Sequence, residues 1–483
     1  MKHFIATAAV AAAAATVIAA PAVADTWQTT WYAAPQPTWG AEFALPTNVP
    51  AALESQTVRE VVRTSVGGTR LRVSFSNRYG SAPLTIGEAR IALAASSGDS
   101  ATPAIGGRAT ADGGGTSAIG GSATGGDATS AIVGSATGGG AAGGGATGAI
   151  VARSGRVLTF GGRRRIVIAP GATAVSDAVD FVLPPLQRLG ISAWLPQRAS
   201  LTTFHWGAQQ TGFIAPGNAT AEERLEGASM LQGRAFLSAV HVAGGKGKGK
   251  GKGEGEDEGE GQGGQGQGGT IVAFGDSITD GNGSTPDRNR RWPDYLAEKL
   301  APQGVGVANA GISGARLLSD RMGVKALDRF QHDVLDQPGV SAVVVLMGIN
   351  DIGWPGSAFA PQEAPATAEQ LIAVYRQLIA RAHAKGLRVI GGTLLPYEGS
   401  LHGTPFEGHY TPAKDAVRRQ VNEWIRNSSA FDAVADFDAA LRDPVHPARL
   451  LPRYDCGDHL HPSDAGYKAM ADVVSALLPR DRN

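Results

Sequence analysis

A glycine-rich, charged stretch at residues 244–269 most constrains how this chain can fold. It holds 14 glycines, four lysines followed by five acidic residues, and no apolar side chain. Glycine at alternate positions makes the backbone costly to order, and nothing in the stretch can join a core, so it predicts a solvated linker. The residues on its two sides must build separate cores. We therefore expect two domains, residues 25–243 and 270–483.

A second low-complexity segment, residues 98–149, lies inside the first of these domains. It holds 18 glycines and a short repeat, SAIGGSATGG at 117–126 and SAIVGSATGG at 130–139. A glycine-rich solenoid or adhesive element is one interpretation, but two copies are too few to bury a continuous core. We interpret the segment as an insertion in a surface loop.

The first 24 residues have the pattern of a secretory signal peptide. Lys2 gives a positive start, an apolar run extends from Phe4 to Ala20, and small residues precede a cleavage position after Ala24. The alternative is a membrane anchor, but the run is short for a bilayer and consists mostly of alanine. We expect a secreted or periplasmic protein without stable membrane insertion.

Charge and cysteine content exclude further classes. The 43 basic residues balance 43 acidic ones, which argues against a protein that mainly binds nucleic acid or an anionic membrane. A single cysteine, Cys456, excludes an intrachain disulfide framework and a cysteine-cluster metal site. No pattern in the sequence sets an oligomeric state.

Apolar residues in the first domain recur with a period near two. Leu71, Val73 and Phe75 alternate with polar residues, and the run Val58–Val66 precedes them across Gly67-Gly68, which predicts a β-hairpin. Short strands with turn residues between them favour an antiparallel β-sandwich. Further strands are expected at Arg165–Ala169, Ala178–Leu183 and Gly190–Leu195.

Five tryptophans of this domain allow two interpretations. Flat aromatic rings can stack on sugar faces, or they can fill a sandwich core or a domain interface, and we favour packing. These residues are Trp27, Trp31, Trp39, Trp194 and Trp206.

The second domain alternates apolar strands with amphipathic helices. This alternation predicts an α/β domain with a mostly parallel sheet, whose chemistry lies on the loops that follow the strands. Strands are expected at Thr270–Phe274, Val305–Ala308, Ser341–Met347, Leu387–Leu395 and Ala433–Phe437, and helices at Trp292–Leu300, Thr367–Lys385, Pro412–Arg426 and Ser463–Leu478.

Three motifs fall on those loops. GDSITDG (275–281) places Ser277 at a strand end and near a helix N-terminus, although Gly-Asp-Ser also forms ordinary turns. GIND (348–351) follows a buried strand, so Asn350 either donates its amide to a developing oxyanion or holds a turn. Asp276 and Asp351 are expected to brace these loops.

The third motif, DHLHP (458–462), precedes the last helix. Asp458 stands three residues before His461, so one loop supplies a base and the carboxylate that orients it. His459 and His461 also form an H-x-H pair of the kind that binds metals, but the only further ligand nearby is Asp458.

These motifs, in this order, resemble the four blocks of the SGNH, or GDSL, family of serine hydrolases over residues 270–480; the remaining block is NAGISGA (309–315). The resemblance implies a flavodoxin-like three-layer α/β/α fold and ester hydrolysis without a cofactor or metal. TWYAAPQ, LRVSFSNRYGSAPLTIG and SDAVDFVLP resemble a bacterial subgroup with a β-sandwich before the hydrolase domain.

Residue by residue, the resemblance implies a Ser277–His461–Asp458 triad. Ser277 and Gly314 would supply oxyanion-hole N–H groups, and Asn350 its side-chain amide. The G-x-S-x-G motif of α/β-hydrolases is absent from the sequence, which removes the main support for a lipase of that fold.

We therefore expect an exported carboxylic-ester hydrolase that acts through an acyl-enzyme on a small-molecule or polysaccharide ester, with acylated carbohydrate favoured. Simple or lipid-like acyl esters are the alternative substrates. A carbohydrate- or surface-binding protein with a degenerate hydrolase domain is the alternative from another class.

Overall fold

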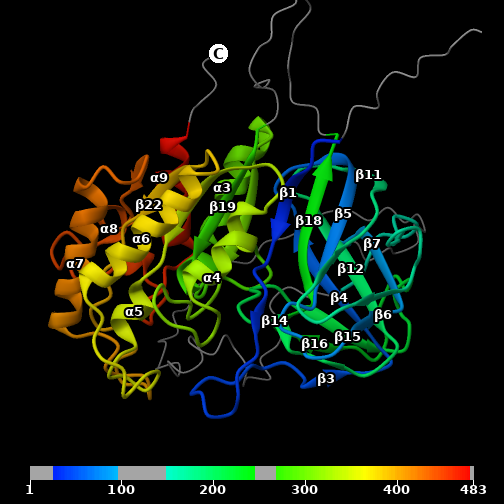
Figure 1. Ribbon diagram of the computed structural model, residues 1–483, viewed down its shortest axis with the longest axis horizontal. Helices are drawn as coiled ribbons and strands as arrows, with labels where there is room; N and C mark the ends of the chain where they lie inside the picture. Colours follow the sequence, from blue (N-terminus) through cyan, green and yellow to red (C-terminus); the bar gives the residue numbers. More distant parts are fainter. Residues whose placement is uncertain (1–24, 96–147, 245–267, 479–483) are drawn as a thin grey trace, which may run out of the picture.

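The computed structural model describes residues 25–95, 148–244 and 268–478. The expected signal peptide, almost all of the insertion at 98–149 and almost all of the linker at 244–269 lie outside these residues. Figure 1 shows a β-rich region, coloured blue to green, beside an α/β region, coloured green to red. Buried apolar side chains form two large clusters, one within the β-rich region and one centred on the α/β region that also includes Tyr32, Phe43 and Ala239 of the β-rich region.

The β-rich region is built on two antiparallel sheets, as the period of two predicts. One sheet has the order β1-β18-β5-β10, with β11 also paired to β5, and the other has the order β16-β15-β4-β12-β7-β8. The strands of the first sheet are β1 (Gln28–Tyr32), β5 (Gly68–Ser76), β10 (Thr173–Val175), β11 (Val179–Leu183) and β18 (Leu237–Ala243). Those of the second are β4 (Gln56–Arg63), β7 (Glu88–Leu93), β8 (Arg156–Leu158), β12 (Arg188–Leu195), β15 (Gly212–Pro216) and β16 (Ser229–Leu231). A three-stranded sheet contains β2 (Gln36–Pro37), β14 (Thr203–His205) and β17 (Arg234–Ala235). Two shorter pairs are β3 (Ala52–Leu53) with β13 (Ala199–Ser200), and β6 (Leu84–Ile86) with β9 (Ile166–Ile168).

The predicted hairpin across Gly67-Gly68 is wrong. Strand β4 pairs with β12 and β15 in one sheet, whereas β5 pairs with β18, β10 and β11 in the other. The glycines carry the chain between the two sheets instead, and a Cβ on Gly67 would lie 2.2 Å from the carbonyl oxygen of Leu183. A local alternation shows which side chains are buried, but it does not show which strand lies alongside.

The α/β region holds a parallel sheet of order β20-β19-β21-β22-β23. This is the flavodoxin-like order, in which the chain first adds a strand on one side and then continues on the other. The expected strands are confirmed, with ends shifted by at most three residues. Their bounds are β19 (Thr270–Gly275), β20 (Gly306–Gly311), β21 (Val340–Leu346), β22 (Arg388–Gly392) and β23 (Ala433–Ala435).

Helices cover the sheet in two contacting groups. Helix α3 packs with α9, while α4 packs with α6 and α6 with α7. This division follows from right-handed crossovers, which place the connections on opposite faces where the strand order reverses. The helices are α2 (Ser277–Asp280), α3 (Trp292–Leu300), α4 (Ala326–Phe330), α5 (Ile349–Gly353), α6 (Ala368–His383), α7 (Pro412–Asn427), α8 (Phe437–Leu441) and α9 (Asp464–Leu477). Single turns are η1 (Ala301–Gln303), η2 (Gln331–Leu335) and η3 (Pro452–Tyr454).

The two regions meet along β1. This strand pairs with β18 on one side, and on its other side Ala33 forms a bridge to Asn309 of β20. The Tyr32 hydroxyl donates to Asp333 Oδ1 across 2.6 Å, and both side chains are buried. Figure 1 shows β1 running between β18 and the α/β region. Buried hydrogen bonds of this kind fix the two regions against each other.

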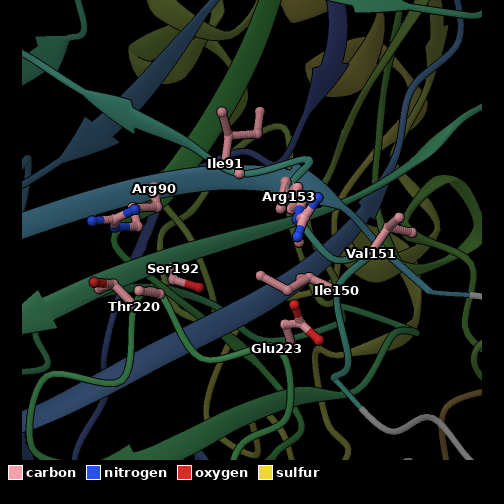
Figure 2. A pocket seen from close by; sticks show the side chains of 12 residues that line it. Arg90, Ile91, Ile150, Val151, Arg153, Ser192, Thr220 and Glu223 are labelled. Carbon is pink, nitrogen blue, oxygen red and sulfur yellow. The ribbon is translucent and has the colours of Figure 1, made fainter.

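The tryptophans of the β-rich region pack against protein. Trp31 is buried beneath the Arg234 guanidinium, 5.1 Å from its ring centre, and Trp39 meets Phe43 edge to face at 5.8 Å. A cavity of about 150 Å³ on this region is lined by Arg90, Arg153, Glu223 and nine further residues, none of them a tryptophan (Figure 2). Packing therefore accounts for Trp31 and Trp39.

Within the described ranges, no helix combines the length and the apolar character needed to cross a bilayer.

Candidate active site

The loops after β19, β20 and β21 meet at one edge of the sheet. Gly275 at the end of β19 is paired with Gly311 of β20 on one side and with Leu346 of β21 on the other. Because the strands are parallel and adjacent, their carboxyl ends place GDSITDG, NAGISGA and GIND side by side. This edge is also where the strand order reverses, which is the usual position of a site in such a sheet.

Ser277 begins α2 directly after β19. Asp276 precedes it as the N-cap and accepts a hydrogen bond from Ile278 N at 3.0 Å. This cap fixes the turn from strand to helix, and the Ser277 side chain is thereby held at the sheet edge. Asp276 acts on the loop as expected, and burial raises the pKa of its carboxyl to about 7.

Ser277, His461 and Asp458 form a continuous chain of hydrogen bonds. Ser277 Oγ lies 2.8 Å from His461 Nε2, and His461 Nδ1 lies 2.6 Å from Asp458 Oδ2. The other Asp458 oxygen accepts from the backbone N–H groups of Leu460 and His461. The short DHLHP loop thus supplies both the ring and the carboxylate that orients it.

The charges along the Ser277–His461–Asp458 hydrogen-bond chain stabilise one another. Burial alone would raise the pKa of Asp458, but the His461 ring and two backbone donors hold it well below the usual range. Burial alone would lower the pKa of His461, but Asp458 outweighs burial and keeps it above the ordinary value of 6.5. An ionised Asp458 therefore faces a ring that accepts a proton readily.

The predicted oxyanion donors come from the two neighbouring loops. Gly314, after β20, has φ +74°, and a Cβ there would lie 2.4 Å from Met322 Sδ. Asn350, on α5 after β21, donates from Nδ2 to Ala315 O at 3.1 Å. That bond joins the two loops beside the nucleophile. Only 5% of Ser277 and 4% of Asn350 is exposed.

Asp351 braces the same loops, as the sequence predicts. Its carboxylate accepts from the backbone N–H groups of Leu317 and Leu318 at 2.8 and 2.9 Å. Burial raises the pKa of Asp351 to about 6, and these two donors oppose that shift.

The H-x-H pair does not converge on a common point. His459 Nδ1 pairs with Asp455 Oδ2 at 2.5 Å, whereas His461 is engaged by Asp458 and Ser277. Asp455, Cys456 and Asp458 lie close enough to hold a cation, but both carboxylates already bind a histidine. The geometry therefore favours the interpretation of His461 as a base over that of a metal ligand.

The sequence missed several polar residues near this edge. Asp280 at the end of α2 accepts from Ser313 and from His205 of the β-rich region. His409 is buried, and burial lowers the pKa of its ring to about 3, so it is neutral at physiological pH. No local motif marks these residues, because their partners lie on distant segments.

Comparisons with known proteins agree with the location of the site. Residues 271–474 match the sequence model of GDSL-like Lipase/Acylhydrolase, which is less than half of the chain. No curated protein matches this chain.

Solved structures are similar to less than half of the chain. One, described as a lipolytic protein of the G-D-S-L family from Desulfitobacterium hafniense, is 22% identical over 43% of this chain and 99% of its own, with a TM-score of 0.32. An acetylxylan esterase from Geobacillus stearothermophilus is 22% identical over 44% of this chain and 94% of its own, also with a TM-score of 0.32. At these identities and scores, we base the function on the residues of the site.

Proposed function

We propose that this chain, in which residues 271–474 form a GDSL-like lipase/acylhydrolase domain, is an exported carboxylic-ester hydrolase that works through an acyl-enzyme. The hydrogen-bonded chain from Ser277 through His461 to Asp458 carries the proposal. We assign export to residues 1–24, a β-sandwich to 25–243 with an insertion at 98–149, a linker to 244–269 and the hydrolase domain to 270–483.

Ser277 is the proposed nucleophile. As its oxygen attacks the ester carbonyl, its proton passes to His461 Nε2, 2.8 Å away. The resulting imidazolium then donates this proton to the departing alcohol, which leaves an acyl-enzyme. Water attacks that ester in the same way, with His461 again accepting and returning a proton.

Asp458 and the oxyanion donors act on charge that appears during the reaction. Asp458 holds the proton on Nδ1, so Nε2 is free to accept, and it stabilises the imidazolium. The proposed oxyanion hole consists of the backbone N–H groups of Ser277 and Gly314 and the Asn350 amide. Such donors stabilise the tetrahedral intermediate more than the substrate, so they lower the barrier rather than tighten binding.

Short acyl groups on carbohydrate are the proposed substrates. An exported enzyme meets cell-wall polysaccharide, and a nucleophile that is only 5% exposed favours a small acyl group over a long chain. Lipid-like esters are the alternative outcome. Acetylated xylo-oligosaccharides and p-nitrophenyl esters of increasing acyl length distinguish them: acetyl esters should be hydrolysed fastest, and a maximum at long chains would contradict the proposal.

A fluorophosphonate probe tests the nucleophile directly. We expect one label per chain, on Ser277, with none in Ser277→Ala. Ser475→Ala is the matched control, because Ser475 lies on α9 and only donates to the Asp472 carbonyl. Labelling at another residue would contradict the assignment. A folded chain with neither label nor turnover would favour the binding protein with a degenerate hydrolase domain.

A further inference from the structure

Asp280 receives hydrogen bonds from three directions at the end of α2. Its Oδ2 accepts from the backbone N–H of Ser313 at 2.9 Å and from the Ser313 hydroxyl at 2.6 Å. Its Oδ1 lies 2.9 Å from Nε2 of His205, which ends strand β14 of the β-rich region. Both partners are buried, with 1% of Asp280 and 3% of His205 exposed. One carboxylate thus joins three separate parts of the chain.

The contacts of His205 define where its protons lie. Nδ1 is 3.0 Å from the carbonyl oxygen of Ala34, which can only accept, so Nδ1 carries a proton. Nε2 lies 2.9 Å from Asp280 Oδ1, and a proton shared between these two atoms makes the bond.

The position of Asp280 links it to the proposed catalytic groups. Ser277 lies three residues earlier on the same short helix, so the two side chains are neighbours on it. Ser313 immediately precedes Gly314, which supplies a proposed oxyanion donor. The carboxylate of Asp280 therefore sets how far α2 stands from the oxyanion loop.

The backbone of the β-rich region also lies against this carboxylate. A Cβ on Gly207, two residues after His205, would lie 2.1 Å from Asp280 Oδ2 and 2.7 Å from Ser313 Oγ. Only glycine fits between these atoms without displacing them. Further along the same loop, the hydroxyl of Thr211 donates to Asp287 Oδ2 at 2.8 Å. The loop from 205 to 211 thus contacts both α2 and the segment after it.

We propose that His205 is a positioning residue that the β-rich domain contributes to the catalytic domain. Through Asp280 it fixes the distance between the Ser277 hydroxyl and the Gly314 N–H. This inference rests on the proposed ester hydrolysis. It makes the β-rich domain an integral part of the active site rather than a detachable binding module.

Two conservative variants of the full chain each keep a different one of the two hydrogen bonds of His205. The amide nitrogen of glutamine reaches the position of Nε2, so His205→Gln keeps a donor to Asp280. The shorter His205→Asn keeps a donor to the Ala34 carbonyl and loses the one to Asp280. With p-nitrophenyl acetate, we expect His205→Asn to lower kcat roughly 10- to 100-fold with KM within about twofold, since misplaced catalytic groups slow the reacting step. His205→Gln should restore kcat to within roughly fivefold of the wild type.

Arg63→Gln is the matched control. It breaks another contact between the domains, the 3.0 Å ion pair with Glu298, which has no link to Asp280. We expect its kcat to equal that of the wild type. Equal kcat values for the two His205 variants, or an equal loss in Arg63→Gln, would overturn the proposal, because either result would indicate general loosening of the interface.

Circular dichroism of each variant shows whether it is folded. Should His205→Asn fail to fold, Gly207→Ala takes its place, because its added Cβ displaces Asp280 and Ser313; we expect the same loss of kcat. Inactive wild-type protein would refute the proposed hydrolysis. Active wild type with fully active His205→Asn and Gly207→Ala would refute the positioning role alone.

Discussion

Two buried polar clusters, one in each domain, differ in how completely their groups are paired. In the β-rich domain, Arg59 of β4 donates from Nε to Ser192 Oγ at 2.7 Å. Its remaining N–H groups donate to the backbone carbonyls of Gly148, Ala219, Thr220 and Glu222. Burial lowers the pKa of Arg59 only to about 10, so the charge persists at neutral pH.

The cluster around Ser277 is built from the same kinds of bonds but remains open at one end. Each ring nitrogen of His461 is engaged, yet the Ser277 oxygen keeps lone pairs that can attack a substrate. Among the described residues, nothing forms a hydrogen bond with the buried Asp276 Oδ2. A closed cluster such as that of Arg59 stabilises the fold, whereas an open one leaves a group available for chemistry.

Replacing the nucleophile should show the largest difference between the clusters. We expect Ser277→Ala, and equally His461→Ala, to lower kcat at least roughly 10⁴-fold, because the attacking oxygen or its base is lost. The unfolding temperature should change little. If either variant hydrolysed the ester at the wild-type rate, the cluster around Ser277 would have no part in the mechanism.

Asp458→Asn should cause the second-largest loss of kcat. Its amide can fix the His461 ring with the proton on Nε2, which then cannot accept the proton of Ser277, so kcat should fall roughly 10³- to 10⁴-fold. Steady-state kinetics on p-nitrophenyl acetate measures this. A loss below about tenfold would mean that Asp458 serves stability, as Arg59 does.

Asn350→Ala tests a donor that acts only in the transition state. We expect kcat to fall roughly 10²- to 10³-fold with little change in KM. If KM rises instead and kcat is retained, Asn350 contacts the ground-state substrate and belongs to binding.

Arg59→Leu tests the closed cluster. Removing the guanidinium leaves the Ser192 hydroxyl and several carbonyls buried without a donor, so the free energy of unfolding should fall by about 3–5 kcal/mol. Urea denaturation measures this, and kcat of the folded fraction should be unchanged. Arg156→Leu is the control, because Arg156 likewise donates to backbone carbonyls but is exposed; its change should stay within about 0.5 kcal/mol.

The pH profile should show the smallest effect. His461 must be neutral to accept a proton, and its pKa is raised, so kcat/KM should increase with pH through an apparent pKa above 6.5. Because Asp276 also titrates near pH 7, this value belongs to the coupled groups. In Asp458→Asn the negative charge that raises the pKa of His461 is gone, while burial still lowers that pKa. The increase of kcat/KM should therefore occur at lower pH. An unmoved profile would mean that another group controls the rate.

Much of the α/β domain was predictable, because its information is local. A helical stripe over Thr367–Lys385 predicts α6, and a continuous apolar run predicts β21. Parallel strands place the loops that follow them at one edge, so the sequence predicts Ser277 and Asn350 at that edge. The strand ends differ by only a few residues, as is usual where pairing rather than composition ends a strand.

The β-rich domain was predictable in class but not in pairing. The alternation of Leu71, Val73 and Phe75 correctly indicates a strand with one buried face. It does not indicate that β5 lies beside β18, whose residues are more than 160 positions further along the chain. Antiparallel pairing depends on which distant strand completes the core, and a turn of two glycines fits a crossover between sheets as well as a hairpin.

By itself, the sequence determined the class of each region, and it indicated the residues that we propose for ester hydrolysis. Periodicity, glycine content and short motifs encode these properties because each depends on neighbouring residues. Only the tertiary structure decided that His205 meets Asp280, 75 residues away. A buried hydrogen bond between domains depends on how two folded surfaces fit together, and no local pattern carries that information.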